Sequence, residues 1–466
     1  MLHHLPMRRE HAVGVSGTPL PEDDELPAAV HLAGPGAQPV LRTALDAVGG
    51  RLDSARSVHI QYRPGSDVVV QFDATVSWHG ATPSRETLMM STSRQGAPAG
   101  TLPVVATVDD RELSVGVWRW PFDPIMPALE HMVTPDRAAA RLVDVVDGPL
   151  ELKVVAYRPM ERAVIRVCAP SGVVIYVKVL APTQVGPLVE RHERLLAAGL
   201  PVPQILAADD VEGWVAMAEL SGETLRQHIK LERVPWPAPS AYGDLLERLR
   251  SVALDGPPRP TRTSDALGHS TMLAAVAPDL ARRIDDLARA LVPAAARSEL
   301  RSATVHGDLH EAQLIVDGDR IVGLLDIDDA GVGDPLDDYA TVLAHLRFRE
   351  TTAATARQRG RIGKYADLLA SNFANEVAEL GVDPRELATV TAGVLVGLAT
   401  GPYRIQHPNW RHDMERLLGR AEQHLQEASR AAAPDERSLS PASWSPHRRM
   451  RELTAPTETP HEGVIT

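Results

Sequence analysis

An acid-rich segment, residues 304–340, constrains this chain more than any other feature of its sequence. The segment holds ten carboxylates and a single basic residue, Arg320. So many like charges repel one another unless something cationic neutralises them, and a divalent metal that bridges phosphates is the natural candidate. The alternative is a surface hairpin whose aspartates cap turns and helices. The order of the residues decides between the two.

The order predicts a hairpin with an acidic group at each mouth. Asp308 follows a His-Gly pair, and Gln313 comes five positions later. The apolar run 314–316 then turns at an Asp-Gly-Asp sequence into a second run, 321–325, which ends on Asp326. Two apolar runs around such a turn are typical of a β-hairpin. The hairpin would place two carboxylates and one amide close together.

Phosphoryl transfer requires this set of groups. One carboxylate orients and deprotonates the accepting hydroxyl, while an amide oxygen and a second carboxylate hold Mg²⁺. The D-x-x-x-x-(N/Q) spacing is that of kinase catalytic loops. We therefore predict that Asp308 is catalytic and that Gln313 and Asp326 are the metal ligands.

The whole pattern reads H-G-D-L-H-x-x-Q-L-I-V-D…L-L-D-I-D-D-A-G-x-G-D-P-x-x-D-Y-A. It closely resembles the aminoglycoside/choline-kinase-like phosphotransferases, a branch of the protein-kinase-like fold. The resemblance covers roughly residues 150–426 and is most specific in the acid-rich segment. Where the usual pattern has Asn, this chain has Gln313. At this position the chain resembles the bacterial maltokinases and related sugar kinases. Both amides offer the same neutral carbonyl oxygen, and the resemblance implies ATP and Mg²⁺ as cofactors.

The expected fold is α+β: a protein-kinase-like bilobal fold, with a small β lobe and a helical lobe, plus an additional β-rich N-terminal cap domain. At 466 residues the chain is long enough for two or three domains. The predicted division is a flexible arm (1–38), the cap (39–148), the kinase-like N-lobe (149–222), the helical C-lobe with the catalytic loop (223–430) and a disordered tail (431–466).

An internal repeat links the cap to the N-lobe. The stretches that begin at Ser57 and Leu152 both place Tyr-Arg-Pro between two alternating β-branched runs. Each reads as a strand, a proline-fixed turn and a second strand, and a third candidate strand follows. In the second copy the third strand carries Lys178, whereas the first copy reads T-L-M-M-S-T without a lysine. We interpret this as a duplication, although Val-rich β-structure produces such matches by chance.

Lys178 has apolar neighbours on its strand, which favours a buried partner over a solvated edge charge. The family resemblance implies that it contacts the α- and β-phosphates and pairs with a glutamate of the next helix, expected over 187–198. Glu190 is the preferred partner, with Glu193 in reserve. The copy has no glycine-rich loop, and Arg158 or Arg162 stands where that loop would supply contacts to phosphate.

The W-V-A-M-A-E sequence at 214–219 resembles the hinge between the lobes of this family. There the purine edge meets backbone groups, which by position would be the Ala218 carbonyl and the Leu220 amide. A plain strand-to-helix junction predicts the same residues. Beyond it the apolar residues recur at helical spacing. Helices are expected at 242–252, 273–291, 293–300, 337–347, 358–380, 384–399 and 413–428. The polar, aromatic loop 401–410 either packs or contacts the acceptor.

The composition of the chain excludes some classes of binding partner. A net charge of −13 argues against a general nucleic-acid binder, and the single cysteine, Cys168, excludes an intrachain disulfide. No stretch reads as a signal peptide or a membrane span, so we expect a cytoplasmic protein without a membrane partner. The expected acceptor is a small-molecule hydroxyl compound, first a sugar or amino sugar and second an aminoglycoside. A nucleotide-binding regulator without turnover stays open, favoured by Gln313 and the missing glycine loop.

Overall fold

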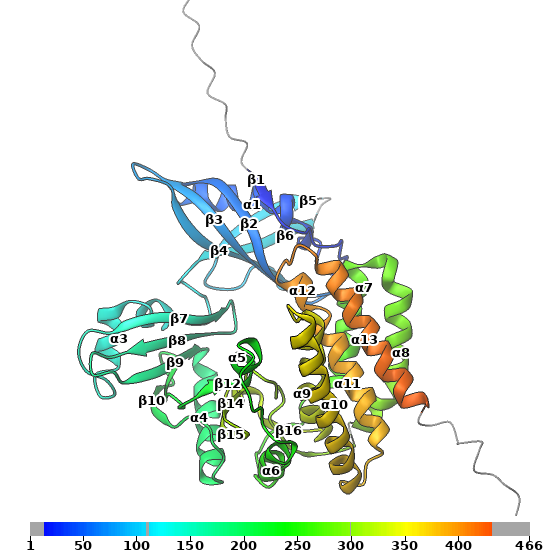
Figure 1. The fold of residues 1–466 in the computed structure, drawn as a ribbon. Coiled ribbons are helices and arrows are strands. Elements are labelled where there is room, and N and C mark those ends of the chain that lie inside the picture. Colours follow the sequence, from blue (N-terminus) through cyan, green and yellow to red (C-terminus); the bar gives the residue numbers. More distant parts are fainter. Residues whose placement is uncertain (1–13, 109–110, 299, 431–466) are drawn as a thin grey trace, which may run out of the picture.

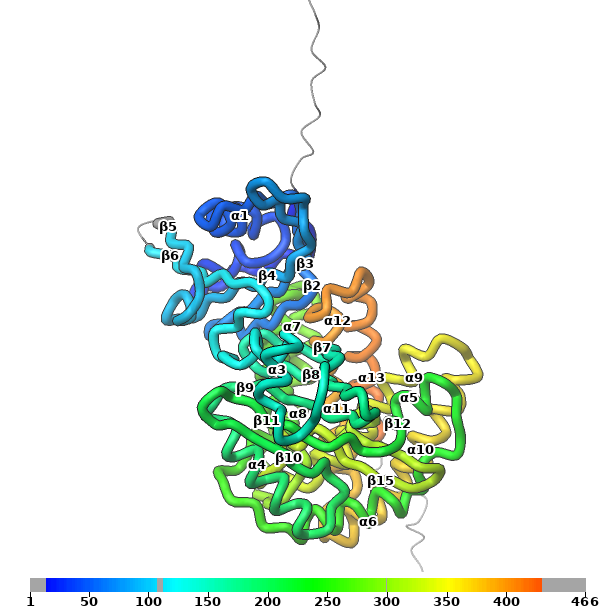
Figure 2. The backbone as a smooth tube through the Cα atoms, turned by 90° about the vertical axis from the view of Figure 1, so that its left-hand side faces the viewer, coloured from blue at the N-terminus to red at the C-terminus, as the bar shows by residue number. Residues whose placement is uncertain are grey.

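The computed structural model describes residues 14–108, 111–298 and 300–430, which form three parts (Figure 1). A β-rich cap lies above a small lobe built on a five-stranded sheet, and a helical lobe lies beside both. Figure 2 shows the same arrangement from the side, with the cap joined to the lobes near α7 and α12. The predicted bilobal α+β fold with an additional cap is confirmed. The predicted tail, 431–466, lies outside the described residues.

The small lobe is an antiparallel sheet with one long helix. It contains, in chain order, β7 (Glu151–Arg158), β8 (Arg162–Cys168), β9 (Val174–Leu180), α4 (Pro182–Ala197), β10 (Ile205–Asp209) and β11 (Trp214–Ala218). The strand order is β10-β11-β9-β8-β7. Alternate β-branched residues of β8 and β9, such as Ile165 and Val177, are fully buried on one face. This alternation is what a strand with one covered face requires.

The cap repeats this sheet. Its strands are β1 (Gly14–Ser16), β2 (Gly50–Arg63), β3 (Asp67–Trp78), β4 (Ser84–Ser93), β5 (Leu102–Val108) and β6 (Arg111–Arg119), with α1 (Gln38–Ala47) between the first two. The order β2-β3-β4-β6-β5 matches β7-β8-β9-β11-β10, and every neighbouring pair in both is antiparallel. The predicted repeat is therefore confirmed as a shared strand arrangement. No helix between β4 and β5 corresponds to α4.

The turns after the two Tyr-Arg-Pro sequences are built alike. In the cap, Gly65 has a positive φ of 68°, and its N–H donates to Asp23 Oδ2 over 2.8 Å. The Tyr62 hydroxyl donates to the same oxygen over 2.8 Å. One carboxylate thus satisfies both the turn and the tyrosine, in a segment that the repeat pattern did not include.

The second copy uses the same device with its own aspartate. Met160 has a positive φ of 61°, and Asp123 Oδ2 accepts bonds from the Met160 N–H at 3.0 Å and from the Tyr157 hydroxyl at 2.8 Å. A positive φ is uncommon for a residue other than glycine. The buried Asp123, in the connector between the copies, stabilises the turn that would cover phosphate.

The duplication also shows what the cap lacks. Lys178 of β9 pairs in register with Val164, four residues after Met160. The equivalent position in the cap pairs with Val69, four residues after Gly65, and it is Ser91. The cap sheet therefore carries a small buried hydroxyl where the N-lobe carries an ammonium group.

Two predicted boundaries were wrong. The arm ends earlier than predicted, because from residue 14 on the chain contributes Val15, Leu20 and Leu32 to the cap's core. It lacks periodicity because it consists of turns, one short strand, η1 (Ala29–His31) and η2 (Gly34–Ala37). The cap also ends earlier, since α2 (Leu129–Met132) and α3 (Pro135–Arg141) pack on the N-lobe sheet. Residues 1–13 are not among the described residues.

The helical lobe surrounds the predicted hairpin. Its helices are α5 (Leu225–Lys230), α6 (Pro239–Arg250), α7 (Arg262–Val276), α8 (Ala281–Ser298), α9 (Leu336–Thr352), α10 (Ala356–Glu379), α11 (Pro384–Leu398), α12 (Gly401–Arg404) and α13 (Trp410–Arg430). The short segments are η3 (Pro278–Leu280), η4 (Ile327–Asp329), β12 (Glu223–Thr224), β13 (Ala303–Val305), β14 (Leu314–Asp317), β15 (Arg320–Leu324) and β16 (Gly331–Gly333). The hairpin is β14 paired with β15, as predicted.

The helix break expected before Pro293 was wrong. Pro293 lies inside α8, whose buried residues Ile284, Leu287, Leu291 and Ala294 continue across it at helical spacing. Burial of one continuous face outweighs the hydrogen bond that the proline removes. The actual break falls at η3. No helix among the described residues is long and apolar enough to span a bilayer.

We predict that Asp123→Ala lowers the free energy of unfolding by about 2–4 kcal/mol, because it leaves two donors of the β7–β8 turn unpaired. Urea unfolding followed by circular dichroism measures this change. Asp73→Ala is the matched control, since Asp73 is exposed on β3 and makes only a long contact with Arg56, 3.4 Å. A loss for Asp123→Ala no larger than that of the control would contradict the assignment.

Candidate active site

The His-Gly-Asp turn is held by a buried carboxylate at the start of α9. Asp338 accepts the N–H groups of His306 and Gly307 over 2.8 and 2.9 Å, and it is almost fully buried. His306 Nε2 lies 2.8 Å from the Leu325 carbonyl oxygen at the end of the hairpin. Gly307 has a φ of 82°, and a Cβ there would lie 2.7 Å from the Asp329 carbonyl oxygen. His306 and Asp338 therefore brace this turn.

Asp308 emerges from this turn beside an arginine. Arg262, the first residue of α7, donates from Nη2 to Asp308 Oδ1 over 2.9 Å and also bonds the Gly307 carbonyl. His310 Nε2 lies 3.6 Å from the other carboxylate oxygen. Burial alone would raise the pKa of Asp308, but Arg262 and the neighbouring histidines outweigh it and lower the pKa below its ordinary value. Asp308 is therefore ionised at neutral pH.

A buried glutamate supports the histidine at this turn. Glu311 accepts bonds from Arg226 at 2.9 Å and from Arg349 at 2.7 Å. Burial opposes its charge, but His345 and these cations lower the pKa of Glu311 to about 2. The His345 ring stacks on His310 with centroids 4.2 Å apart. The imidazole next to Asp308 is thus fixed by packing from α9.

A second cluster joins the lobes. Lys178, with a side chain only 6% exposed, places Nζ 3.1 Å from Asp326 Oδ1 and also contacts Asp328. Arg162, at the start of β8, lies 2.8 Å from Asp326 Oδ2. Burial would raise the pKa of Asp326, but Lys178 and Arg162 outweigh it and lower the pKa strongly. Asp326 also has left-handed backbone angles, φ 53° and ψ 54°, a strain typical of functional residues.

The predicted metal ligands lie together. The Gln313 amide is 3.3 Å from Asp326 Oδ2, so the two side chains face the same point. Asp326 is ionised and offers a carboxylate, and Gln313 offers a neutral carbonyl oxygen. Oxygen ligands of this kind are those that Mg²⁺ prefers, together with phosphate oxygens and water. The residues therefore fit a magnesium ion bound jointly with phosphate.

The predicted partner of Lys178 was wrong. Glu190 is 62% exposed and pairs with Arg194 at 2.7 Å, and the reserve candidate Glu193 is also exposed. Helix α4 buries Val185, Leu188, His192 and Leu195. At 100° per residue, Glu190 and Glu193 lie away from that face. Lys178 is instead neutralised by the two aspartates after the hairpin.

The two predicted hinge residues lie where the chain leaves the small lobe. Ala218 is the last residue of β11, paired with Ile175, and Leu220 follows two positions later. The chain then enters β12, which pairs with β14 of the catalytic hairpin. The purine contacts through the Ala218 carbonyl and the Leu220 amide stay a prediction.

Three residues of the site were missed or left unranked. Arg262 lies 46 positions before its partner Asp308, in a segment without a motif. Arg191 of α4 donates to the Asp328 carbonyl oxygen over 2.7 Å, so α4 contributes a cation rather than an acid. Asp328 was recognised only as one of two neighbouring acids. The excess of acids in 304–340 indicated that cations must come from other parts of the chain, but it did not indicate which parts.

The comparisons agree with this geometry. Residues 161–370 match the phosphotransferase enzyme family APH. No curated protein matches the sequence. Similar solved structures include an aminoglycoside phosphotransferase APH(4)-Ia in complex with ADP and hygromycin B: 14% identity, 63% of this chain, 98% of that chain and a TM-score of 0.44.

Two further structures have comparable values. The streptomycin–ATP complex of APH(2'')-IIa shares 13% identity over 62% of this chain and 95% of that chain, with a TM-score of 0.40. A choline/ethanolamine kinase family protein from Mesorhizobium loti shares 17% over 63% and 96%, with a TM-score of 0.41. At such identities and TM-scores these structures carry no conclusion about the substrate of this chain.

The resemblance recognised from the acid-rich segment therefore agrees with the family model, which matches the APH phosphotransferase family over residues 161–370. The enzyme class that follows is a phosphotransferase. The maltokinase-like features suggested by Gln313 stay a prediction.

We predict that Lys178→Met lowers kcat/KM roughly 10²–10³-fold, the usual effect of removing an electrostatic clamp. Initial rates of ADP formation measure this change, and circular dichroism checks the fold. The matched control is Lys153→Met, because Lys153 is exposed on β7 of the same sheet. If both variants keep wild-type kinetics, Lys178 does not act on phosphate.

Proposed function

We propose that the protein is an ATP-dependent phosphotransferase that transfers the γ-phosphate to a hydroxyl of a sugar or amino sugar. The observation that carries the proposal is the pairing of two acidic centres on one hairpin. Asp308 is ionised beside Arg262, and Asp326 is ionised beside Gln313 and Lys178. Asp308 would then act as the base for the acceptor, and the group around Asp326 would bind the phosphates.

Asp308 would accept the proton of the acceptor hydroxyl as the oxygen attacks phosphorus. Its low pKa makes it a weak base, so its main contributions are orienting the hydroxyl and receiving the proton late in the step. Arg262 holds Oδ1, which leaves Oδ2 for the acceptor. His306, Gly307 and Asp338 keep the turn rigid, which preserves the alignment that phosphoryl transfer depends on.

On the phosphate side, Gln313 and Asp326 would hold Mg²⁺, and the bound ion would neutralise charge on the phosphates. In this structure Lys178 and Arg162 form ion pairs with the carboxylates of Asp326 and Asp328. When nucleotide binds, these cations would turn from the aspartates towards the phosphates. Arg162 lies beside the turn that replaces a glycine-rich loop, and it would supply the charge which that loop's backbone provides in other kinases.

The two alternative functions, an aminoglycoside phosphotransferase and a regulator without turnover, require different properties of the same residues. An aminoglycoside acceptor fits the class equally well, and some structural neighbours are named as aminoglycoside phosphotransferases. A regulator without turnover would need no ionised Asp308 beside a metal site. Arg262 bonds Asp308, and Asp338 holds the turn that presents it, and this fixed arrangement favours an enzyme. A panel of neutral sugars, amino sugars and aminoglycosides, assayed for ADP release, separates the three.

Asp308→Asn keeps the shape and the hydrogen bonds of the turn but removes the charge. We predict that it binds ATP·Mg near normally by calorimetry and turns over roughly 10²–10⁴-fold more slowly. Asp317→Asn is the control, because Asp317 is exposed at the hairpin turn and pairs only with Arg320, at 2.6 Å. Wild-type turnover by Asp308→Asn would remove Asp308 from the mechanism.

Gln313→Leu removes the amide oxygen from the metal site at nearly constant volume. We predict that the Mg²⁺ concentration needed for half-maximal rate rises about 10-fold or more, as expected when a ligand is lost. Gln313→Asn, which keeps the oxygen one methylene shorter, should retain part of the activity. A normal Mg²⁺ response in the leucine variant would show that Gln313 is not a ligand.

A further inference from the structure

Arg404 is a partly buried cation without a partner. It is the last residue of α12, between the helical lobe and the cap. Among the described residues, none accepts a hydrogen bond or forms an ion pair with its guanidinium. Burial lowers the pKa of Arg404; nearby Arg158 and Arg63 lower it further, and Glu161 opposes them. The Arg404 side chain is only partly buried, and none of its nitrogens is among the fully buried unpaired atoms, so its donors are available to an anionic ligand.

Further unpaired polar groups lie on the cap side. After a bulge in β2, Ile60 and Tyr62 face the cap's core, so His59 and Gln61 face the other way. Gln61 is 7% exposed, and its Nε2 has no hydrogen-bond partner. Burial lowers the pKa of His59 to about 4, with Arg404 the next cause, so the imidazole is neutral and near the guanidinium.

Helix α7 connects this place to Asp308. Arg262, Asp265 and His269 follow one another at i, i+3 and i+7 and so lie on one face of the helix. Arg262 holds Asp308, and seven residues of helix span roughly 10 Å. Burial lowers the pKa of His269 to about 4, again with Arg404 as the next cause, and its buried Nδ1 has no partner. A polar face thus runs from the catalytic aspartate to Arg404.

The cap is fixed at this place. The Thr18 N–H donates to Gln406 Oε1 over 2.7 Å, and the Tyr403 hydroxyl donates to the Pro19 carbonyl over 3.1 Å. Of the two roles that the sequence left open for loop 401–410, these bonds show packing on the cap, and they leave Arg404 without a partner among the described residues. We name the group His59, Gln61, His269 and Arg404 the junction cluster.

We propose that the acceptor carries an anionic group, a carboxylate or a phosphate ester, and that the junction cluster binds it while the acceptor's hydroxyl lies at Asp308. This inference rests on the proposed function and names its substrate class. The cluster offers an unpaired guanidinium and neutral donors to the ligand, whereas the neighbouring Arg63 and Arg158 already pair with Asp67 and Glu161. A polycationic aminoglycoside would meet repulsion there. A span of roughly 10 Å suits a sugar with one charged substituent.

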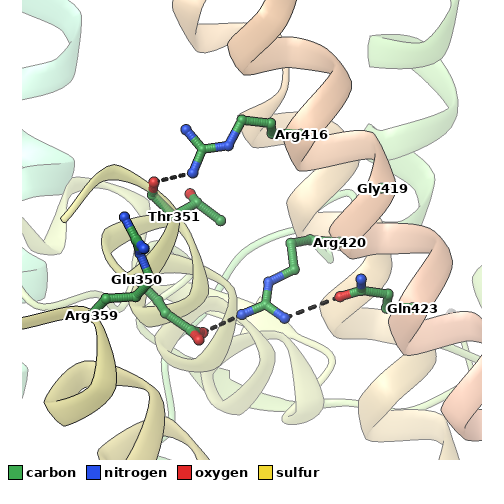
Figure 3. Close-up of a pocket in the computed structure, with 7 residues that line it drawn as sticks. All are labelled: Glu350, Thr351, Arg359, Arg416, Gly419, Arg420 and Gln423. Atoms are coloured by element: carbon green, nitrogen blue, oxygen red, sulfur yellow. Dashed lines mark hydrogen bonds and ion pairs between the residues drawn. The ribbon is translucent and has the colours of Figure 1, made fainter. Parts of the chain in front are cut away.

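A hollow on the helical lobe provides a contrast. About 420 Å³ in volume, it is lined by Arg359, Arg416 and Arg420 among others (Figure 3). Arg420 bonds Glu350 and Gln423, and Arg416 bonds the Thr351 carbonyl, as the dashed lines in Figure 3 show. These two cations have partners within the protein, whereas Arg404 has none among the described residues.

The test compares acceptors that differ only in charge. Initial rates are measured with glucose, glucosamine, glucuronate and glucose 6-phosphate, and we expect an anionic compound to have a KM at least 10-fold below that of glucose. Arg404→Met should raise that KM roughly 10–100-fold, the range for a charge-assisted hydrogen bond, and leave the KM for ATP unchanged. Gln61→Leu should raise it less. Arg411→Met is the control, because Arg411 lies nearby on α13 and pairs with Asp279.

Three outcomes would overturn the inference: a preference for glucose or glucosamine, an unchanged acceptor KM in Arg404→Met, or a change in the ATP KM alone. If no compound is phosphorylated, the proposed function fails separately. Calorimetric titration with glucuronate and glucose 6-phosphate, in the presence of a non-hydrolysable ATP analogue, then decides the inference. Binding that Arg404→Met weakens supports it, and binding absent from the wild type overturns it.

Discussion

The active site depends on the ion cluster around Asp326, because it is the contact that ties the two lobes together electrostatically. Lys178 and Arg162 come from the small lobe, while Asp326 and Asp328 follow the hairpin of the helical lobe. Each partner is largely withdrawn from water, so an unpaired member would be expensive. The cluster therefore fixes where the lobes meet, and it keeps Asp326 ionised and able to bind metal.

The duplicated sheet explains how the protein combines a cap with a kinase-like lobe. Both copies have the same strand order and the same aspartate-held turn, through Asp23 in one and Asp123 in the other. Only the second has a lysine and a following helix; the first has Ser91. The cap sheet lacks the buried lysine and the following helix, and it packs on α12 and on the β7–β8 turn. That packing creates the junction cluster.

Charge is distributed unevenly, and the net value of −13 conceals this. Asp308, Asp326 and Asp328 are matched by arginines from α7 and β8, and Glu311 is matched by Arg226 and Arg349. Every one of these acids therefore meets a cation from another part of the chain. Arg404 is the reverse case, a cation that lacks an acid. The overall charge consequently says little about what the site binds.

The sequence by itself determined the hairpin, the fold class and the positions of Asp308, Gln313 and Asp326, because these depend on local spacing and on alternation along strands. It also contained the repeat, since Tyr-Arg-Pro recurs in the same setting. The tertiary structure decided the rest. Which cation faces which acid depends on helix rotation and on contacts across many residues: Glu190 points to solvent, while Arg262 reaches Asp308 from 46 positions away. Burial, not spacing, kept α8 continuous through Pro293. Only the tertiary structure shows that Arg404 has no partner among the described residues.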